Sequence, residues 1–529
     1  MTARSPVPGS WLVLLGTAAA ARLLLQVLAM APYAGLDEGF HVARVAYVSV
    51  ERRQPVARQL SVPGYISNSM AGMPGSPPGF GTLQDRWKDN LAARPEGWKD
   101  VALDRGARPD YVAANYEAQQ PSLYYAAAAP ADRLFGTTQL RELLVLRLIA
   151  VVCGVITVLA TGLLGARLWG PSGLLVGLLL LATPTWITLV ARAGNDAPAC
   201  AALAVAILLS VLPDAGWKQR AGEAVCWALA VALKVYTWPA VVLLPLLWPR
   251  RTPRARQALV AAAVALSGSV TALDLVARTG NPIGSSAFWS GGGVALSGDS
   301  LARLVGLPWL QFFKVFAGSA IWTSGEHANF LRPIGLALFV APWVVLVFAG
   351  FSAFRSLPAR RAWLLAAALL VFAIAEVGQA WGNLRQEVLG RVATQSAGLA
   401  GWYMHSLDPI WFGVGLGFAV AVLHARRSAV PLVLVLAGAF LADLCVTEGA
   451  VFRDYAGLSS PRTPGSFVRW GGGTPWEALV RLGRYGLWLP SPWLAVALRI
   501  LELVGAALLI GKAARPQVAP VAAAGEKTL

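Results

Sequence analysis

The sequence predicts an all-α polytopic membrane protein, and three observations support this prediction. Of its 529 residues, 56% are hydrophobic and 13% are charged, whereas a soluble globular domain carries about 25% charged residues. Apolar runs of about 20 residues, the length that crosses a bilayer as a helix, recur along the chain. The basic residues outside these runs form short clusters that can all lie on one side of a membrane. Together these features exclude a soluble fold.

The apolar runs set the expected number of membrane spans. The run at 222–248 is too long for one simple helix and contains Lys234 and Pro239, so we expect a hairpin of two short helices there. Residues 121–135 are short for a crossing, and we expect them to stay on one side, which gives about twelve spans. The runs fall at residues 11–30, 141–165, 171–190, 196–212, 222–248, 257–276, 333–353, 361–380, 402–423, 429–446 and 491–511.

Basic clusters set the expected orientation, because cytoplasmic loops retain Lys and Arg. If the N-terminus is inside and residues 121–135 do not cross, every short basic cluster falls on the inner side. We therefore expect both termini in the cytoplasm and polar outer loops at 31–120, 277–332, 381–401 and 447–490. The excess of Arg, Ala and Gly indicates a bacterial plasma membrane. The inner clusters are Arg167, Lys218, Arg220, Arg250, Arg251, Arg254, Arg256, Arg355, Arg360, Arg361, Arg426, Arg427, Lys512 and Arg515.

The loops divide the chain into two expected parts. Residues 1–276 form an N-terminal membrane module that includes the outer loop 31–120, whose Trp and Tyr residues suit short helices at the membrane surface. Residues 277–529 form the C-terminal transmembrane helices. The net charge of +17 comes from arginines scattered over short loops, so we expect no nucleic-acid partner. The four cysteines lie in apolar runs without metal-ligand spacing.

An acidic pair, Asp37-Glu38, follows the first apolar run, and His41 comes three residues later. If a helix starts here, Asp37 and His41 lie on the same face. A carboxylate at a partly apolar interface has a raised proton affinity and can accept a proton from a hydroxyl or an amine at neutral pH. The alternative is a helix N-cap whose acids are solvated just outside the membrane.

Two further polar motifs stand where the chain enters apolar segments. Tyr116, Gln119 and Gln120 precede Pro121 and can hydrogen-bond a polar ligand at the headgroup level. An aromatic belt explains the tyrosines of this region equally well, but not the glutamine pair. The motif Asn195-Asp196 lies between two apolar runs, where unpartnered polar groups are costly. A simple turn with a helix cap is its alternative explanation.

Single charged residues inside apolar runs are also candidates, because intramembrane cations are commonly functional. Lys234 can pair with an acid or hold an anionic headgroup, and for Arg22 we expect a partner on a neighbouring helix or snorkelling. His405 stands near the outer start of a later span. A metal site of His41, Glu38 and His405 has no supporting ligand spacing. The cofactor therefore stays unknown: a divalent metal is compatible with the sequence but not indicated.

The order of the motifs resembles the GT-C superfamily of membrane glycosyltransferases, especially the protein O-mannosyltransferase and aminoarabinose-transferase type. The acidic pair follows the first span, the segment 120–125 (QPSLYY) returns to the membrane, and Asn195-Asp196 comes next. The resemblance covers roughly residues 11–250. It implies a GT-C-like bundle that transfers a sugar from a polyprenyl-phosphate-linked donor to a hydroxyl or amine, with inversion. The acceptor would be a lipid, a glycan or a protein on the outer face.

Carried over to this sequence, the resemblance implies that Asp37 is the catalytic base and that Glu38 is the second member of the catalytic pair. Gln119 and Gln120 stand where related transferases have a charged pair, and Ser122 replaces a second proline. Recognition of the donor phosphate is therefore expected from another cation, such as Lys234, Arg147 or an arginine of the later loops. Asp196 would close the pocket. The expected substrate-binding residues are His41, Tyr116, Gln119, Gln120, Asn195, Asp196, Lys234 and His405.

Two other classes of protein remain open at this point. A transporter or lipid flippase also commonly has twelve spans with both ends inside, but we find no two-fold repeat and no matched pair of broken helices. A non-catalytic scaffold or sensor could use the outer loops for binding. A transferase, in contrast, requires Asp37, Gln120 and Asp196 to line one pocket, within about 15 Å of one another.

Overall fold

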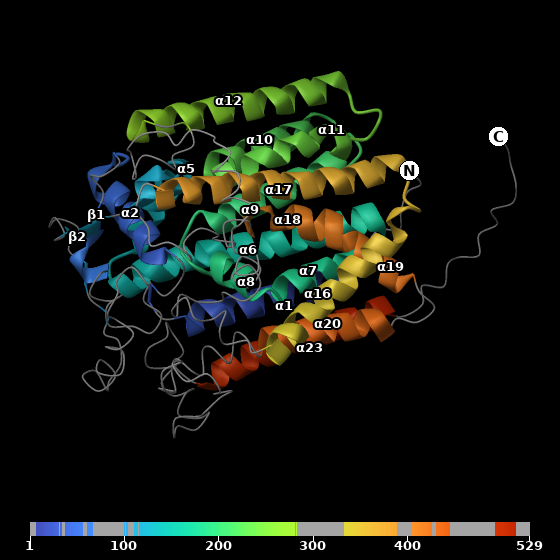
Figure 1. Ribbon diagram of the computed structural model, residues 1–529. Helices are drawn as coiled ribbons and strands as arrows, with labels where there is room; N and C mark the ends of the chain where they lie inside the picture. The colour runs from blue at the N-terminus through green and yellow to red at the C-terminus, as the bar shows by residue number, and fades with distance from the viewer. Residues whose placement is uncertain are drawn as a thin grey trace, which may run out of the picture.

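The chain folds into a bundle of helices with a small cap at one end (Figure 1). The computed structural model describes residues 7–30, 32–33, 37–56, 61–66, 100, 102–103, 111–114, 116–280, 282, 333–388, 405–425, 430–444 and 492–514. In these ranges the two named strands are β1 (Ser61–Pro63) and β2 (Tyr111–Ala114), which pair antiparallel.

The cap contains the short elements that follow the first helix. They are α2 (Glu38–Glu51), β1, β2, the 3-10 turn η2 (Tyr116–Gln119) and α5 (Leu123–Phe135). We call this end of the bundle the loop end and the opposite end the far end. α5 has 13 residues and is therefore about 20 Å long at 1.5 Å per residue. It is shorter than the roughly 30 Å hydrocarbon core, in agreement with a segment that does not cross.

The remaining helices form the bundle, and most of them run along its axis. They are α1 (Gly9–Ala29), α6 (Gln139–Trp169), η3 (Pro171–Leu175) with α7 (Val176–Leu181), α8 (Pro184–Ala191), α9 (Asp196–Val211), α10 (Trp217–Leu233), η4 (Val235–Leu243) with α11 (Leu244–Leu247), α12 (Arg254–Thr279), α16 (Pro333–Phe354), α17 (Ala359–Val388), α18 (Asp408–Ile410) with the π-helical turn η6 (Trp411–Leu416) and α19 (Gly417–His424), α20 (Val430–Asp443) and α23 (Pro492–Ala514). α12 lies at one edge of the bundle, and α20 and α23 lie at the other (Figure 1).

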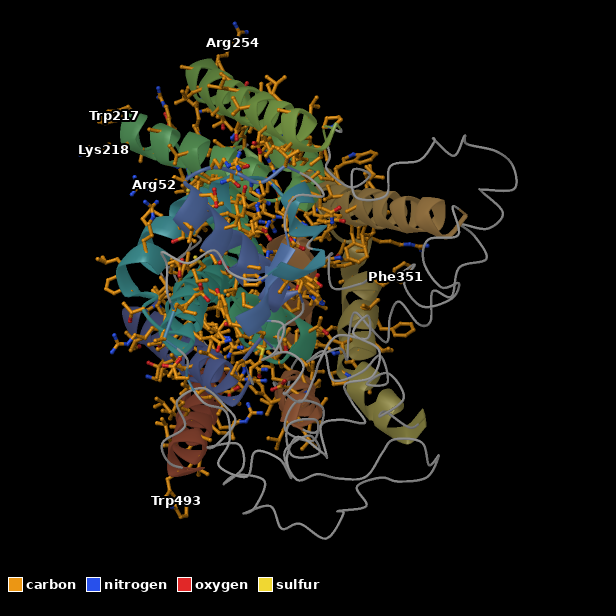
Figure 2. The ribbon with its side chains drawn as sticks, turned by 90° about the vertical axis from the view of Figure 1, so that its left-hand side faces the viewer. Arg52, Trp217, Lys218, Arg254, Phe351 and Trp493 are labelled. Carbon is orange, nitrogen blue, oxygen red and sulfur yellow. The ribbon has the colours of Figure 1, made fainter. Side chains whose placement is uncertain are left out.

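Several helices have the length and composition of membrane spans. Among the described residues, five helices are long and apolar enough to cross a membrane, or six if one bent pair counts as a single span. In the edge helices α12 and α23, 17% and 28% of the apolar stretch is buried. Phe351 and Trp493 lie on the outside of the bundle (Figure 2). An apolar outer surface of this kind needs lipid around it, so the chain is an all-α multi-pass membrane protein.

Contacts between α1 and its neighbours fix the direction of the first and last helices. α1 ends at the loop end, where Arg147 of α6 donates to the carbonyl of Met30 at 2.8 Å. The second half of α23 packs on the first half of α1, since a Cβ on Gly505 would lie 3.2–3.3 Å from Leu14 and Ala18. α1 therefore begins, and α23 ends, at the far end. The predicted placement of both termini on one side of the membrane requires this arrangement.

The predicted run at 171–190 is not one straight helix. α7 ends at Leu181 and α8 begins at Pro184, and the two halves are bent by 76°. Thr183, the residue before the proline, is extended with φ −109° and ψ 98°, because the proline ring disfavours a helical conformation there. α8 leads into the turn whose Ala193 N–H donates to Glu38. The prediction from apolar length alone did not include this break.

Of the other predictions from the sequence, one is confirmed, and several concern residues that the structure does not describe. The run 222–248 divides at Lys234, as expected, into α10 and η4 with α11. Most of the outer loops 277–332, 381–401 and 447–490 lies outside the described residues, and so does most of the loop 31–120. About twelve spans, the division at 276/277 and the contents of these loops stay predictions.

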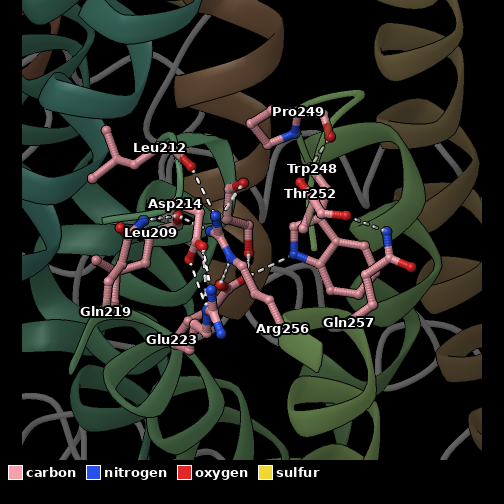
Figure 3. Close-up of polar contacts among 12 residues, drawn as sticks. Leu209, Leu212, Asp214, Gln219, Glu223, Trp248, Pro249, Thr252, Arg256 and Gln257 are labelled. Atoms are coloured by element: carbon pink, nitrogen blue, oxygen red, sulfur yellow. Dashed lines mark hydrogen bonds and ion pairs between the residues drawn. The ribbon is translucent and has the colours of Figure 1, made fainter. Parts of the chain in front are cut away.

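Two buried charge networks hold the bundle together away from the loop end. Arg22 of α1 pairs with Asp443 of α20 at 3.1 Å and with Glu502 of α23 at 3.7 Å, which confirms the expected pairing with neighbouring helices. At the far end, Glu223 accepts hydrogen bonds from Ser210, Trp248 and Arg256 at 2.6–2.7 Å (Figure 3). We call Ser210, Glu223, Trp227, Trp248 and Arg256 the far-end cluster.

Candidate active site

Asp37 lies immediately before α2 in a left-handed backbone conformation with φ 56°. Its carbonyl accepts from the N–H groups of Phe40 and His41 at 3.0 Å, which starts the helix. Its carboxylate makes no capping bond to α2, and the residue is 5% exposed. Left-handed non-glycine residues are strained and concentrate at functional sites. The alternative of a solvated helix cap is therefore wrong, and the carboxylate faces the protein interior.

Glu38 has a different environment from its neighbour. Both of its carboxylate oxygens accept from Arg147 of α6, at 2.8 and 2.6 Å, and one also accepts from the N–H of Ala193 at 2.8 Å. Arg147 in turn holds the carbonyls of Val27 and Met30. This buried bidentate pair joins α1, α2, α6 and the α8–α9 turn, so it fixes where Asp37 stands. Arg147 therefore pairs with Glu38, and its guanidinium is not directed at a donor phosphate.

The turn between α8 and α9 presents a buried acid with two cations. Asp196, the first residue of α9, pairs with Arg192 and with Lys234. All three side chains are at most 3% exposed. Asn195 makes no capping bond to α9, so the interpretation as a simple capped turn is wrong. Its amide instead donates to the carbonyl of Leu233 at 2.9 Å.

Lys234 reaches Asp196 because α10 ends one residue earlier. Lys234 is extended, with φ −156° and ψ 129°, and the break leaves the last carbonyls of α10 available to side-chain donors. Thr237 donates to the carbonyl of Ala230 at 2.7 Å, and Trp238 donates to that of Val231 at 2.8 Å. With Asn195 on Leu233, these side chains satisfy the broken end, which a membrane requires. The break is stabilised by these hydrogen bonds, and it places Lys234 at the loop end.

Arg192 has hydrogen-bond donors that no described residue accepts. One of its terminal nitrogens pairs with Asp196, whereas Nε and Nη1 are buried and have no hydrogen-bond partner among the described residues. A guanidinium remains protonated in proteins, and a buried donor without a partner is costly. An anion that accepted both N–H groups would remove this penalty, and phosphate matches the planar fork of arginine.

The segment before Pro121 is held by its backbone. Arg44 donates to the carbonyls of Glu117 and Gln120 at 2.5 and 2.8 Å, and Arg278 donates to those of Ala118 and Gln120. The two glutamine side chains are therefore left for other contacts. Gln120 accepts from Asn195 at 3.4 Å. The side-chain oxygens of Gln119 and Asn195 are buried without a hydrogen-bond partner among the described residues.

Glu117, Tyr125 and His41 form a contiguous buried group beside these residues. Glu117 Oε2 lies 3.2 Å from Tyr125 Oη and 3.3 Å from His41 Nδ1. Burial, reinforced by the charge of Asp37, raises the pKa of Glu117 to about 8. Burial also lowers the pKa of His41, and the charge of Arg192 lowers it further. Both shifts favour the uncharged forms of the Glu117 carboxyl group and the His41 imidazole.

The structure brings most of the predicted site residues together. The ring of His41 packs on the α8–α9 turn, because a Cβ on Gly194 would lie 3.4 Å from its Nε2. Through this turn and the Gln120–Asn195 contact, Asp37, Gln120 and Asp196 belong to one region, as the transferase prediction requires. The cations and acids of this region, with His41 and Asn195, we call the loop-side cluster: Asp37, His41, Glu117, Arg192, Asn195, Asp196 and Lys234.

Other predicted residues stand apart or stay untested. His405 pairs with Asp408 at 2.6 Å, and its carbonyl accepts from Cys200, one turn along α9 from Asp196. Tyr116 begins η2, and its side chain lies outside the described ones. His41, Glu38 and His405 each contact a different partner, and no group of three metal-ligating residues occurs in the described part of the chain. Substrate binding by these residues stays a prediction.

Sequence reasoning did not assign roles to Arg192, Glu117, Tyr125 or Arg44. Arg192 lies three residues before the motif Asn195-Asp196, which drew attention for its amide and its acid alone. Arg44 interrupts the apolar side of α2, a signal that would have marked it as a buried cation. Glu117 lies between Tyr116 and Gln119, and Tyr125 ends the segment 120–125, but their contact with His41 joins residues far apart in the sequence. No pattern in one segment can show such a contact.

Comparison with known proteins finds solved structures of similar fold, with low TM-scores and low sequence identity. No family model matches the chain, and no curated protein matches it. The chain is similar to ArnT from Cupriavidus metallidurans bound to undecaprenyl phosphate, with a TM-score of 0.45, 17% identity and coverage of 95% of this chain and 77% of that one. It is also similar to the oligosaccharyltransferase from Archaeoglobus fulgidus in complex with zinc and sulfate, with a TM-score of 0.43, 13% identity and coverage of 81% and 52%. At these scores no residue role is transferred from either protein.

Proposed function

We propose that the chain is a membrane glycosyltransferase that moves a sugar from a polyprenyl-phosphate-linked donor to an acceptor hydroxyl or amine. The observation that carries the proposal is a buried arginine, Arg192, with two unpartnered N–H donors. It lies close enough to Asp37 for their charges to interact. A phosphate on Arg192 would put the anomeric carbon of the donor near a buried carboxylate. In a transferase this carboxylate can accept the proton of the attacking acceptor.

In this mechanism Asp37 is the general base. The acceptor oxygen or nitrogen attacks the anomeric carbon while its proton passes to the Asp37 carboxylate. The bond between that carbon and the phosphate oxygen breaks, and the lipid phosphate leaves with the electron pair. Attack opposite the leaving group inverts the anomeric centre. General base catalysis contributes about 10²–10⁴-fold, and positioning of the two substrates contributes further.

The other residues bind or position. Arg192 would take the phosphate and stabilise the charge that develops on it, while Lys234 balances Asp196. The free oxygens of Gln119 and Asn195 are acceptors suited to sugar hydroxyls. Glu38 is a positioning residue, because Arg147 and Ala193 already use its oxygens. We retain Asp37 as the catalytic member of the acidic pair.

The topology supports an outward-facing site. The loop end carries the cap, and the basic residues of the inner clusters that the structure describes at α10, α12 and α17 begin helices at the far end. With the far end inside, the site faces outward, both termini are cytoplasmic and about twelve helices cross the membrane. In a bacterium this is the outer leaflet of the plasma membrane, where lipid, glycan or protein acceptors of the cell envelope are accessible.

The test is purification of the full chain followed by mass spectrometry of the bound lipids. We expect a polyprenyl phosphate or a polyprenyl-phosphate-linked sugar to co-purify with the wild type. The variant Asp37→Asn should retain the lipid and accumulate the sugar-linked form. If both proteins carry only bulk phospholipid, the proposal is wrong. If the Asn variant still turns over the linked sugar, Asp37 is not the base, and another group must accept the proton of the acceptor.

A further inference from the structure

The amide of Asn195 has an orientation that its neighbours determine. Its Nδ2 lies 2.9 Å from the carbonyl oxygen of Leu233 and 3.4 Å from Oε1 of Gln120. A backbone carbonyl can only accept a hydrogen bond, so the nitrogen of the amide must face Leu233. This carbonyl is available because α10 ends at Leu233 and Lys234 is extended. The broken helix therefore fixes which way round the amide of Asn195 stands.

The oxygen of the same amide is buried and lacks a hydrogen-bond donor in the described part of the chain. Asn195 is 0% exposed, and none of the residues that the structure describes donates to its Oδ1. Oδ1 and Nδ2 diverge from one carbon atom, so Oδ1 is directed away from the Leu233 and Gln120 oxygens that accept from Nδ2. A buried acceptor without a partner is costly. A donor group of a ligand would remove this penalty.

The donors of Arg192 lie on the same turn as this acceptor. A Cβ on Gly194 would lie 3.5 Å from Nε of Arg192, so the arginine side chain folds back over the turn between α8 and α9. Nε and Nη1 of Arg192 also have no partner among the described residues. The turn therefore offers N–H donors for an anion and, at Asn195, an acceptor for a hydroxyl group.

A sugar linked to a phosphate has the two matching groups side by side. Its anomeric carbon carries the phosphate, and the next ring carbon, C2, carries a hydroxyl group. A phosphate matches the guanidinium of Arg192, and a hydroxyl hydrogen matches the oxygen of Asn195. Among the hydroxyl groups of the sugar, the 2-hydroxyl is the nearest to the phosphate along the covalent bonds. It is therefore the group that an acceptor beside Arg192 would select.

We propose that Asn195 is a specificity-determining residue whose Oδ1 accepts a hydrogen bond from the 2-hydroxyl group of the donor sugar. Leu233 and Gln120 are positioning residues, because they hold Nδ2 and thereby turn Oδ1 toward the ligand. The donor is then a polyprenyl phosphate whose sugar has a free 2-hydroxyl group. The inference rests on the proposed function for the lipid phosphate, and it adds the class of sugar.

Binding of synthetic lipids to the wild-type chain in lipid nanodiscs tests the inference. The lipids are undecaprenyl phosphate and its mannosyl, glucosyl and 2-deoxyglucosyl derivatives. Mannose and glucose differ only in the configuration at C2, and 2-deoxyglucose is the 2-deoxy form of both. We expect one of the two hexosyl lipids to bind about tenfold more tightly than the 2-deoxyglucosyl lipid, which leaves Oδ1 of Asn195 without a donor. Equal affinities for all the sugar-linked lipids would contradict the inference.

The variant Asn195→Ala separates sugar recognition from a purely structural role. It should bind the preferred hexosyl lipid about tenfold more weakly than the wild type does. It should bind the 2-deoxyglucosyl lipid and undecaprenyl phosphate no more weakly, because the effects of removing two groups in contact do not add. An equal loss for all the lipids would make Asn195 structural. If this variant does not fold, the comparison of lipids on the wild type decides alone.

Gln219→Ala is the matched control for this variant. Gln219 also donates a side-chain N–H to a carbonyl near the end of a helix, that of Leu209 in α9 at 3.4 Å, but it does so at the far end (Figure 3). This variant should bind every lipid of the set as the wild type does.

The sugar that co-purifies with the wild type gives a second test. Mass spectrometry of the bound lipids, after cleavage and derivatisation of the sugar, should show a free hydroxyl group at C2. A 2-deoxy or a 2-acetamido sugar would overturn the inference and leave the proposed function in place. If the wild type neither carries nor binds any of the polyprenyl lipids, the proposed function fails, and the inference fails with it.

Discussion

The loop-side cluster and the far-end cluster are both buried, both contain arginine and acid, and both join α9 to α10. In the far-end cluster every side-chain polar atom has a partner: Arg256 donates to Glu223 and to the carbonyls of Leu209 and Leu212 (Figure 3). In the loop-side cluster Arg192 and Asn195 keep buried atoms without a partner among the described residues. About 14 residues of α9, or roughly 21 Å, separate the two.

This difference separates a cluster that stabilises the fold from a cluster that can bind a ligand. A buried network whose groups are all satisfied rigidifies the helices around it, whereas a partly satisfied one is costly unless a ligand completes it. A folding requirement alone therefore explains the far-end cluster. It does not explain the loop-side cluster, in which a broken helix, a strained Asp37 and a bent span all converge. Five predictions test this comparison, from the largest expected effect to the smallest.

Asp37→Asn should lower turnover by about 10²–10⁴-fold, because the amide cannot accept the acceptor's proton. The measurement is single-turnover transfer from the co-purified lipid-linked sugar. Affinity for undecaprenyl phosphate and the thermal midpoint should stay close to those of the wild type. Equal losses in binding and turnover would mean that Asp37 holds the ligand and does not act as the base.

Arg256→Gln should destabilise the protein by about 3–5 kcal/mol, since it leaves Glu223 buried without its ion pair. Thermal unfolding in detergent measures this effect. Arg254→Gln is the matched control, because Arg254 is exposed at the start of the same helix (Figure 2). Similar thermal midpoints for the two variants would show that the far-end cluster does not stabilise the bundle.

Arg192→Gln removes the same charge from the other cluster and should give the opposite pattern. We expect affinity for undecaprenyl phosphate to fall by about 10–100-fold, corresponding to loss of hydrogen bonds between charged groups. Thermal stability should change little, because Asp196 keeps Lys234. A variant that binds normally but unfolds early would make Arg192 structural and would remove the contrast between the two clusters.

Glu117→Gln should raise thermal stability at alkaline pH. The unfolded state gains ionisation above its ordinary pKa near 4.5, while the folded group stays protonated up to about pH 8. Stability of the wild type is therefore lost progressively as pH rises between these values. The difference in thermal midpoint between variant and wild type should grow from pH 5 to pH 8 and then level off. A constant difference would mean that Glu117 is not buried as a neutral acid.

Gln119→Ala should have the smallest effect of the five. One neutral hydrogen bond contributes about 1 kcal/mol, which corresponds to roughly a fivefold increase in KM for the sugar donor. Affinity for undecaprenyl phosphate, which lacks the sugar, should be unchanged. If both ligands weaken equally, Gln119 acts on the phosphate region and not on the sugar.

The sequence predicted more of the architecture than of the site. Apolar length and charge bias gave an all-α membrane protein, and the break at Lys234 was visible because a lysine and a proline interrupt one run. The bend at Thr183 was not predicted, since a proline after a threonine is also compatible with two separate helices or a kink. Within the site, Asp37 and Asp196 stood out as acids at the ends of apolar runs.

Composition and the length of the apolar runs by themselves determined that this chain is an integral membrane protein, because the hydrophobic effect acts on each segment separately. They also located the acids and amides where apolar runs end. Only the tertiary structure showed which buried charges pair. Glu38 pairs with Arg147 and Asp196 pairs with Lys234, whereas two N–H groups of Arg192 have no partner among the described residues. The physical reason is that pairing of buried charges depends on which helices meet, and these pairs join residues as far apart as 38 positions (Asp196 and Lys234) and 109 positions (Glu38 and Arg147).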